Sequence, residues 1–175
     1  MKDRPTRRGT MFIDRVPEAP PAAPAAAPSP EPSASKVDAD LNAREIVGRM
    51  MAKDVFSQWL GVEVLEVADK QAVVRMTVRP EMMNGFGFAH GGIVFAFADS
   101  AHAFCSNSRG EISVAVDCNI SYPAPIRSGD VLTATAVEQT STNRLAFSEI
   151  TVRNQDDVIV ALFRGTVYRT RKPLP

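Results

Sequence analysis

The chain has 175 residues, enough for one domain with an appendage, and its 20 lysines and arginines balance its 20 aspartates and glutamates. A net charge of zero excludes the basic excess typical of nucleic-acid-binding proteins, so we expect no nucleic-acid partner. No stretch reaches the roughly 20 apolar residues of a membrane helix, and no secretory leader is recognisable, so we expect a cytoplasmic protein without a membrane partner. Cys105 and Cys118 lack a C-x-x-C pattern, which predicts free thiols in a reducing compartment.

Residues 1–40 differ in composition from everything after them. Eight of the thirteen prolines fall here, in a tract rich in alanine and serine. Such a tract cannot bury enough apolar surface to order itself. We therefore predict a disordered arm over residues 1–40 and a folded domain over residues 41–172.

The first predicted element is a helix that begins near Asp40, with Asp38 or Asp40 as its N-cap, and ends at Gly61. Its apolar residues recur at helical spacing, which predicts one face packed on the core: Ile46, Val47, Met50, Met51, Val55, Trp59 and Leu60. Two strands are expected next, over 62–68 and 71–79, with a tight turn between them.

The stretch from His90 to Gly110 combines a nearly all-apolar helix with a single carboxylate, Asp99. The helix has no face that looks solvated, so we expect it to be buried on most sides. A carboxylate there is costly unless it is hydrogen-bonded, lines a cavity or does chemistry, which makes Asp99 a candidate catalytic residue. Gly91 and Gly92 open the helix where backbone N–H groups lack partners, so a ligand oxygen can approach them closely.

The spacing of Gly91 and Asp99 adds a constraint. Eight residues along one helix separate them by about 12 Å. That is too far for both to act on one carbonyl group. If both are catalytic, two copies of the helix meet antiparallel across a two-fold axis, which predicts a homodimer with shared sites.

The chain after Gly110 is predicted to be β structure to its end. Strands are expected at 112–122, 130–140, 143–153 and 158–170, separated by turns. Long antiparallel strands with one apolar helix after the second strand indicate the α+β class, in which a curved antiparallel sheet wraps around a central helix.

Several motifs are missing from the sequence. His90 and His102 lack the spacing of histidine or cysteine metal ligands, so we expect no metal site. There is no glycine-rich nucleotide loop and no G-x-S-x-G turn, so those routes to nucleotide binding and serine hydrolysis are not supported. His102 lies one helical turn past Asp99, and we interpret it as a hydrogen-bonded core or interface histidine rather than as a general base.

Three stretches carry a family resemblance: NGFGFAHGGIVFAFADSAHAFCSNSRG, DCNISYPAPIRSGDVLTATA and VALFRGTVYR. Together they resemble the hot-dog-fold acyl-CoA thioesterases of the PaaI type, named for the phenylacetic acid degradation protein. The likeness runs from about Glu45 to Thr170 and leaves out the arm. It implies a hot-dog fold, an acyl-CoA substrate, no metal or cofactor, and dimers with shared sites that pair into homotetramers.

The resemblance also implies roles for individual residues. Asp99 matches the acidic residue that activates water as a general base or attacks the thioester itself. Gly91 matches the residue whose N–H polarises the thioester carbonyl. His90 and Asn84 match polar residues that orient that carbonyl or the water, and Ser100 matches a hydroxyl position near the nucleophilic water.

Substrate contacts are expected beside these residues. Gly92 belongs to the bare helix start, and Phe86 and Phe88 add aromatic bulk that favours an aryl or medium-chain acyl group of the phenylacetyl type. The chain departs from the family pattern at Ala124, where an arginine or lysine often precedes the proline. We expect Arg127, nearby, to take over contact with the phosphates of coenzyme A.

Three alternatives remain open from the sequence. One is a hot-dog thioesterase of menaquinone synthesis, which tends to have glutamate at the position of Asp99. Another is an acyl-thioester hydratase or dehydratase, which would need a catalytic histidine facing an acid. The third is a non-catalytic acyl-CoA sensor that keeps the pocket, and the presence of Asp99 counts against it.

Overall fold

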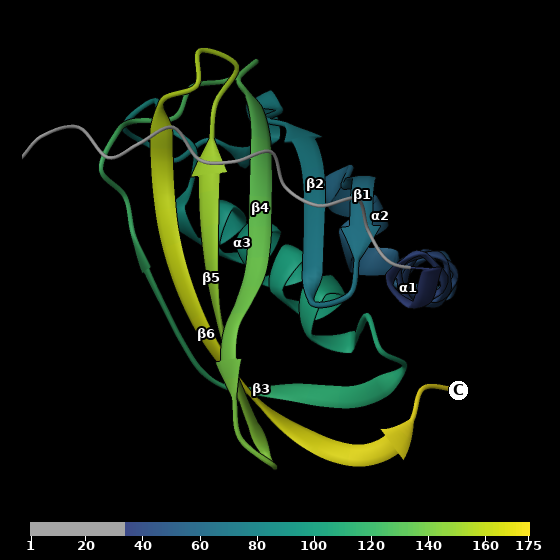
Figure 1. Cartoon of the computed structure of the whole chain (residues 1–175). Coiled ribbons are helices and arrows are strands. Elements are labelled where there is room, and N and C mark those ends of the chain that lie inside the picture. Colours follow the sequence, from purple (N-terminus) through teal and green to yellow (C-terminus); the bar gives the residue numbers. More distant parts are fainter. Residues whose placement is uncertain (1–33) are drawn as a thin grey trace, which may run out of the picture. The chain divides into compact units, whose positions relative to one another are not determined.

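The computed structural model describes residues 34–175, which form helices on one side of a six-stranded sheet (Figure 1). The helices are α1 (Ala34–Lys53), α2 (Val55–Leu60) and α3 (Gly91–Asn107), with a short 3-10 turn at Pro80–Met82. The strands are β1 (Glu63–Ala68), β2 (Gln71–Thr77), β3 (Glu111–Ser121), β4 (Val131–Ser141), β5 (Leu145–Arg153) and β6 (Ile159–Pro173). All six predicted strands are present, with boundaries shifted by a few residues at most.

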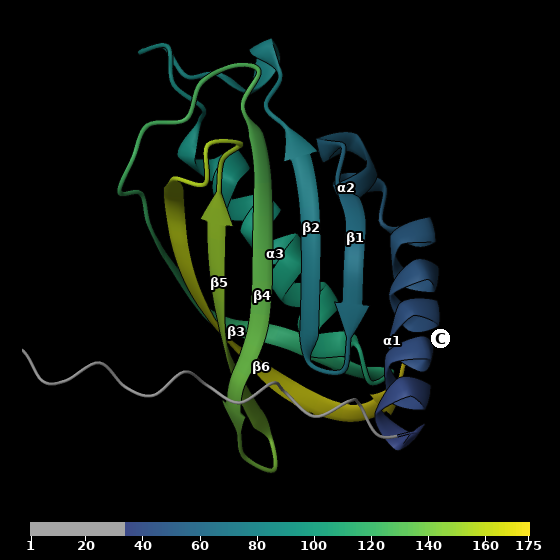
Figure 2. The ribbon, with the colours of Figure 1, turned by 45° about the horizontal axis from the view of Figure 1, so that its top comes forward.

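The sheet is antiparallel throughout and has the order β1-β2-β4-β5-β6-β3. It curves around α3, as two views of the ribbon show (Figures 1 and 2). This arrangement confirms the predicted α+β class and the curved sheet around a central helix. The two edges of the sheet differ, because α1 lies beside β1 whereas β3 forms the other edge without a neighbouring strand in the described chain.

The first helix begins earlier than predicted. Residues 1–33, most of the predicted disordered arm, lie outside the described residues, and α1 begins at Ala34, two positions after the last proline of the tract. Asp38 and Asp40 therefore lie inside the helix, and the N-cap prediction is wrong. The residues between Pro32 and Asp40 include alanine and charged residues but no proline, so the helix can begin before Asp40.

The predicted single helix up to Gly61 is broken at Asp54. There the backbone leaves the helical region, and the Asp54 carboxylate caps α2 by accepting a hydrogen bond from Ser57 N–H at 2.9 Å. Because of this break, the apolar face of α2 does not continue that of α1. Val55 and Trp59, which were predicted to be core residues, are 77% and 56% exposed. Gly61 ends α2, as predicted, and its φ of 80° is the left-handed conformation typical of glycine after a helix.

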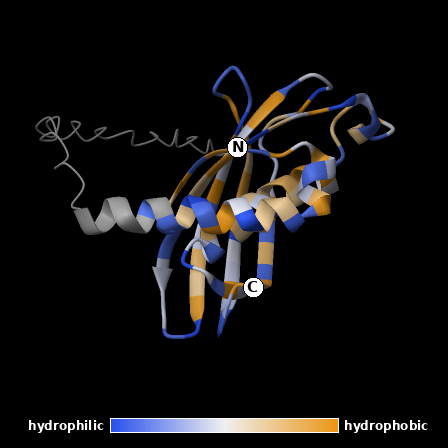
Figure 3. Cartoon of the chain, turned by 90° about the vertical axis from the view of Figure 1, so that its right-hand side faces the viewer, coloured by the Kyte–Doolittle hydropathy of each residue, from blue (hydrophilic) through white to orange (hydrophobic). Residues whose placement is uncertain are grey.

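The core lies between α3 and the concave face of the sheet. Strand β2 contributes alternate residues to it, and β4 faces them in register. The buried side chains of this layer are Val74, Met76, Phe97, Phe104, Leu132, Ile150 and Phe163. Figure 3 shows α1 crossing one side of this domain, with many hydrophilic residues on the side turned to the viewer.

Helix α3 is not buried all round. Gly92 is exposed, and Phe95, Ala96, Asp99 and Ala103 are only half-buried, at the spacing of one helix face. The same half-open character continues onto β3, whose Val114 and Val116 are exposed. Asp99 therefore lies in the middle of an apolar stripe that the monomer leaves accessible.

Among the residues that the structure describes, each helix falls short of the length and apolarity that crossing a bilayer requires.

Candidate active site

His90 caps the N-terminus of α3 and accepts hydrogen bonds from most of the backbone N–H groups there. Its Nδ1 accepts a hydrogen bond from Gly92 N–H at 3.0 Å. Its carbonyl oxygen accepts hydrogen bonds from Ile93 N–H at 2.9 Å and from Val94 N–H at 3.4 Å. The Gly91 N–H donates to no acceptor in residues 34–175. A free donor at the positive end of a helix is suited to an oxyanion.

Tyr122, which follows β3, supports this helix start from the side. Its hydroxyl donates to the Gly91 carbonyl oxygen at 2.7 Å, and a Cβ on Gly91 would lie 3.3 Å from the same hydroxyl. The Gly91 carbonyl and the Gly92 N–H belong to one peptide group, so the Tyr122 bond strengthens the donor that holds His90. Because Nδ1 of His90 accepts, a neutral ring carries its proton on Nε2, which is left as a donor.

The loop before His90 is closed by Asn84. Its Oδ1 accepts hydrogen bonds from Phe86 N–H at 2.8 Å and Phe88 N–H at 3.3 Å, and its backbone N–H donates to the Phe88 carbonyl oxygen at 2.7 Å. Gly87 has a φ of 81°, which side chains rarely tolerate. The side-chain oxygen of Asn84 thus holds the loop, and its amide hydrogens are left to donate.

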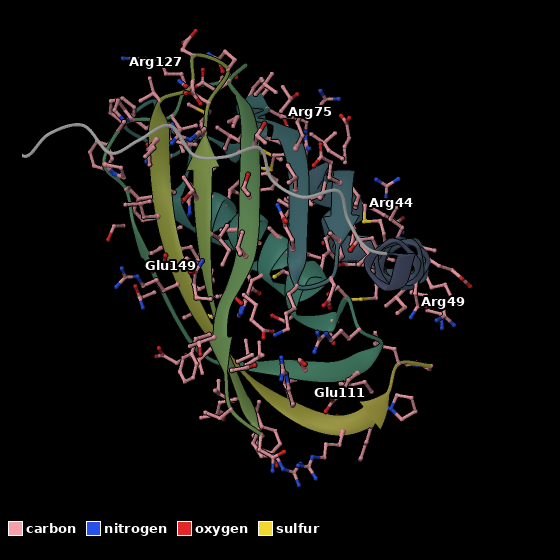
Figure 4. All side chains as sticks on the ribbon, in the orientation of Figure 1. Arg44, Arg49, Arg75, Glu111, Arg127 and Glu149 are labelled. Atoms are coloured by element: carbon pink, nitrogen blue, oxygen red, sulfur yellow. The ribbon has the colours of Figure 1, made fainter. Side chains whose placement is uncertain are left out.

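A hollow of about 360 Å³ opens beside the start of α3. It is lined mostly by apolar residues: Phe88, Ala89, Gly91, Val94, Tyr122, Pro123, Ala124, Pro125 and Ile126. The guanidinium carbon of Arg127 lies 5.5 Å from the centre of the Phe88 ring, and Arg127 lies at the opposite end of the sheet from Glu111 (Figure 4). The structure therefore brings Phe88 and Arg127 to the helix start, whereas Phe86 is 87% exposed and does not line the hollow.

Asp99 lies in the middle of α3, away from the donor at its start. Its side chain is 45% exposed, and its Oδ1 lies 3.8 Å from Nδ1 of His102. The helix rise separates Asp99 from Gly91 by about 12 Å. One chain therefore presents an acid in the middle of α3 and an oxyanion donor at its start, without bringing them together.

His102 is buried, as predicted, but it lacks the predicted hydrogen bond. Its side chain is 1% exposed, and its Nε2 has no partner among the described residues. The ring packs against Phe163, with 5.7 Å between ring centres, and against Gly165. A Cβ on Gly165 would lie within 3.0 Å of the ring, so the glycine makes the space for His102.

The two cysteines are unpaired. Burial raises the pKa of the Cys105 thiol to about 12. Burial, with the neighbouring charges of Asp99 and Asp117, raises the pKa of the Cys118 thiol to about 11. Both thiols are protonated at neutral pH, so neither is an activated nucleophile.

Ser100 does not project toward an open surface. Its buried hydroxyl lies 2.8 Å from the Ser57 hydroxyl and 3.1 Å from the Ala96 carbonyl oxygen. Ser57 in turn donates to the Asp54 carboxylate at 2.6 Å. These bonds join α3 to the cap of α2, so in the monomer the Ser100 hydroxyl is used to hold these helices together.

The sequence model of the Thioesterase superfamily matches residues 86–161, which include the loop, α3 and most of the strands after it. The acyl-coenzyme A thioesterase PaaI of Escherichia coli (strain K12) is 38% identical over 120 residues, covering 69% of this chain and 86% of that protein. This chain belongs to the thioesterase superfamily, and within it to the PaaI-type acyl-CoA thioesterases.

Other similar proteins agree with this assignment. Human acyl-coenzyme A thioesterase 13 is 32% identical over 117 residues, covering 64% of this chain and 82% of that protein. The solved structure of E. coli PaaI, from the phenylacetic acid degradation operon, superposes with a TM-score of 0.76 at 34% identity and covers 78% of this chain and 99% of its own. The smu.793 protein of Streptococcus mutans, solved bound to acetyl-CoA, has a TM-score of 0.62 at 26% identity and covers 64% of this chain and 90% of its own.

Two features of this PaaI-type chain escaped the sequence reasoning. Tyr122 was not singled out, because its contact with Gly91 spans distant segments and has no local signal. Cys118 lies near Asp99 and His102, although nothing in their spacing along the chain indicates it. The one available signal for Tyr122 was its place at the end of the strand predicted over 112–122, at the edge where loops usually gather.

Proposed function

We propose that this thioester hydrolase cleaves acyl-CoA to a free acid and coenzyme A, with Asp99 as general base or nucleophile and the Gly91 N–H as oxyanion donor. The observation that carries the proposal is that α3 leaves both groups without a hydrogen-bond partner in the described chain. The Gly91 N–H has no partner in the described chain, and the Asp99 carboxylate is half-exposed within an apolar stripe. The named thioesterase activity of the relatives supports the same reaction class.

The chemistry follows from these two groups. The Gly91 N–H stabilises the negative charge that develops on the thioester oxygen as the carbonyl carbon becomes tetrahedral. Asp99 either removes a proton from the attacking water or attacks the carbonyl carbon directly. His90 Nε2–H and the Asn84 amide supply further donors that orient the carbonyl or the water. Ser100, whose buried hydroxyl is bonded to Ser57 and to the Ala96 carbonyl, is proposed to position α3 instead of contacting that water.

The complete site is proposed to form between two subunits. Because about 12 Å separates Gly91 from Asp99 along α3, the donor of one subunit must serve the acid of its partner. The half-buried stripe on α3 and the open edge of β3 support such a contact, since both leave apolar residues exposed in the monomer. We further propose that two dimers pair into a tetramer.

The substrate is proposed to be an aryl or medium-chain acyl-CoA of the phenylacetyl type. The apolar hollow at the start of α3 has aromatic walls from Phe88 and Tyr122 and is large enough for such a group. Arg127 at its rim carries the charge for a coenzyme A phosphate, while Gly92 and the exposed Phe86 complete the proposed contact surface. The unpaired cysteines fit a reducing compartment, and we propose the cytoplasm.

The first test is hydrolysis of a panel of phenylacetyl-, hydroxyphenylacetyl-, benzoyl- and straight-chain acyl-CoA, with the released acid measured by chromatography. We expect turnover, fastest with aryl or medium-chain groups. Tight binding of acyl-CoA without cleavage of any thioester would contradict the proposal and would support the sensor alternative.

The second test asks whether sites are shared. Gly91→Pro removes the N–H, while proline suits the first helical position and His90 already has the extended backbone that precedes proline. We expect Gly91→Pro and Asp99→Asn each to keep about a hundredth of wild-type activity or less when refolded alone. Unfolded and refolded together, they should regain about a quarter of wild-type activity, because half of the dimers are mixed and each has one intact site. No recovery, with mixed dimers demonstrated, would contradict shared sites.

A further inference from the structure

Three side chains with metal-binding atoms meet beside the middle of α3. They are Asp99 and His102 on α3 and Cys118 on β3, and one ligand atom from each lies within 4.8 Å of the other two. They offer a carboxylate oxygen, an imidazole nitrogen and a sulfur. No role proposed above for the hydrolysis uses His102 or Cys118.

The imidazole of His102 lacks the partners that a buried ring normally has. Its side chain is 1% exposed, and its Nε2 is buried without a hydrogen bond to the described chain. Its Nδ1 faces Asp99 Oδ1 at 3.8 Å, which is too long for a hydrogen bond. Because Nδ1 forms no hydrogen bond within residues 34–175 and faces the Asp99 carboxylate, its lone pair is free to bind a cation, while Nε2 keeps the ring proton.

The packing holds this ring in place beside the other two residues. Gly165 on β6 leaves the space that the ring occupies, since a Cβ there would lie within 3.0 Å of it. Gly165 is also the residue that pairs with Cys118 across the sheet. One position of β6 therefore aligns the imidazole with the strand that carries the sulfur.

Nitrogen, oxygen and sulfur together form a donor set that suits Zn²⁺, which takes three protein ligands and leaves a fourth position open in many sites. In a tetrahedral zinc site neighbouring ligand atoms lie about 3.5 Å apart, close to the 3.8 Å between Asp99 and His102. The half-exposed Asp99 leaves an approach for the ion and for a water in the fourth position.

We propose that Asp99, His102 and Cys118 form a binding site for a single Zn²⁺ ion. His102 would bind through Nδ1, Asp99 through one carboxylate oxygen and Cys118 as a thiolate. The thiol proton passes to solvent when the ion binds, and no redox change occurs. The ion adds positive charge between Asp99 and the sulfur, where two negative charges would otherwise repel each other.

Occupancy has a consequence for the hydrolysis, and this part rests on the proposed function. A carboxylate that ligates Zn²⁺ loses basicity and nucleophilicity, because the cation neutralises its charge, so it is poorly able to take a proton from water or to attack the thioester. Zinc binding therefore switches the site off, and its removal by a chelator restores it.

Cobalt tests the site directly, because Co²⁺ replaces Zn²⁺ in such sites and a cobalt–thiolate bond gives a charge-transfer band in the near ultraviolet. The full chain, freed of metal with a chelator, is titrated with Co²⁺. We expect one ion per chain with this band, and its loss when Zn²⁺ is added. Cys118→Ser should abolish the band, and Cys105→Ser, which changes the other thiol, should keep it.

His102→Phe, which retains a ring against Phe163, should weaken Co²⁺ binding by at least about tenfold. A band that is absent from the wild type, or that persists in Cys118→Ser, would overturn the metal site. The far-ultraviolet circular dichroism of each variant checks that it is folded.

Activity is measured for each variant with and without Zn²⁺, and the effect of the ion is given as the ratio of these two rates for the same protein. We expect Zn²⁺ to lower the wild-type rate at least about tenfold, the chelator to restore it, and the ratio for Cys118→Ser to stay near one. An unchanged wild-type rate at saturating Zn²⁺ would overturn the inhibition. If no thioester is cleaved under any condition, the proposed function fails, while the cobalt spectra still decide the metal site.

Discussion

The two ends of α3 differ in whether their polar groups form hydrogen bonds with the rest of the molecule. At the C-terminal end, neighbouring segments take up polar groups: Ser108 Oγ accepts from Lys70 N–H at 2.9 Å, and the Asn107 side chain accepts from Ser113 N–H at 2.8 Å. Arg109 forms two hydrogen bonds with the Asp69 carboxylate. At the N-terminal end the Gly91 N–H has no acceptor in the described chain.

This difference suggests separate roles along α3: the C-terminal end contributes to stability, and the N-terminal end and the centre are available for chemistry. Partnered groups hold the C-terminal end of α3 to the sheet, so changes there should alter the free energy of unfolding. Free or half-exposed groups at the N-terminal end and the centre are available to a substrate, so changes there should alter rates. The following experiments test that separation, from the largest expected effect to the smallest.

Asp99→Asn should reduce turnover by about a hundred-fold or more, because the amide keeps the shape and loses the base. The free energy of unfolding should stay the same or rise, since the half-exposed carboxylate forms no ion pair within hydrogen-bond distance. Steady-state kinetics and urea denaturation measure the two effects. Glu66→Gln, an exposed carboxylate on β1, is the control and should change neither. Full activity of Asp99→Asn would remove Asp99 from the chemistry.

Gly91→Pro should reduce turnover by about a hundred-fold, the usual cost of losing an oxyanion donor. Gly91→Ala is its matched control, because alanine keeps the N–H and brings similar crowding toward Tyr122. The two variants are compared by turnover number and by thermal unfolding. Equal losses in both would mean that crowding, and not the missing donor, lowers the rate.

Glu138→Gln should destabilise the fold by about 3 kcal/mol with little effect on turnover, because it removes the partner of Lys70 and Arg169, both 2.7 Å away. Burial alone would raise the pKa of Glu138, but the hydrogen bonds from these two cations outweigh it and lower the pKa. A lowered pKa stabilises the fold above the unfolded-state value and loses this effect as pH falls through the folded-state value. Urea denaturation should therefore show a difference from wild type that is largest near neutral pH and shrinks below about pH 4. A constant difference would contradict the ionic account.

Gly165→Ala should destabilise the fold by about 1–3 kcal/mol, because the new methyl group meets the His102 ring. In a His102→Ala background the same change should cost much less, since the obstructing ring is gone. Denaturation of the wild type, both single variants and the double variant measures this coupling. Additive effects would mean that the ring and the glycine do not compete for the same space.

Tyr122→Phe should lower turnover only a few-fold, with an unchanged KM and fold, since it loses one hydrogen bond of about 1 kcal/mol to the Gly91 carbonyl. The measurement is a comparison of kcat and KM. Tyr168→Phe, a partly exposed tyrosine on β6, serves as the control. A rise in KM alone would place Tyr122 in substrate binding instead of in the support of the helix start.

The sequence was informative where structure follows from local patterns. The strand expected at 71–79 is observed as Gln71–Thr77, because alternation and Pro80 are local signals. The break at Asp54 was missed, because an aspartate three residues before a serine is also compatible with a continuous helix. The apolar spacing of α3 predicts burial on most sides, as observed, but which face stays half-open depends on the neighbours that the sheet leaves out.

The residues of the candidate site likewise fall into two groups: those whose arrangement follows from local sequence and those that only the fold brings together. Gly91, His90 and Asp99 lie within one helix and its cap, so their arrangement could be predicted from the helix rise alone. Tyr122 and Cys118 reach α3 through the pairing of β3 with β6, which no short window of sequence encodes. The hydrogen bond from Ser100 to Ser57 likewise depends on the docking of α2.

The open edge of β3 also bears on the behaviour of the chain as a monomer. An edge strand that exposes Val114 and Val116 offers unpaired backbone groups and apolar side chains to any other extended chain. At low concentration the folded monomer therefore carries a template for aggregation, which pairing with a second copy would cover. If the chain pairs through this edge, the fraction of chains that expose it should rise on dilution and fall as the protein is concentrated.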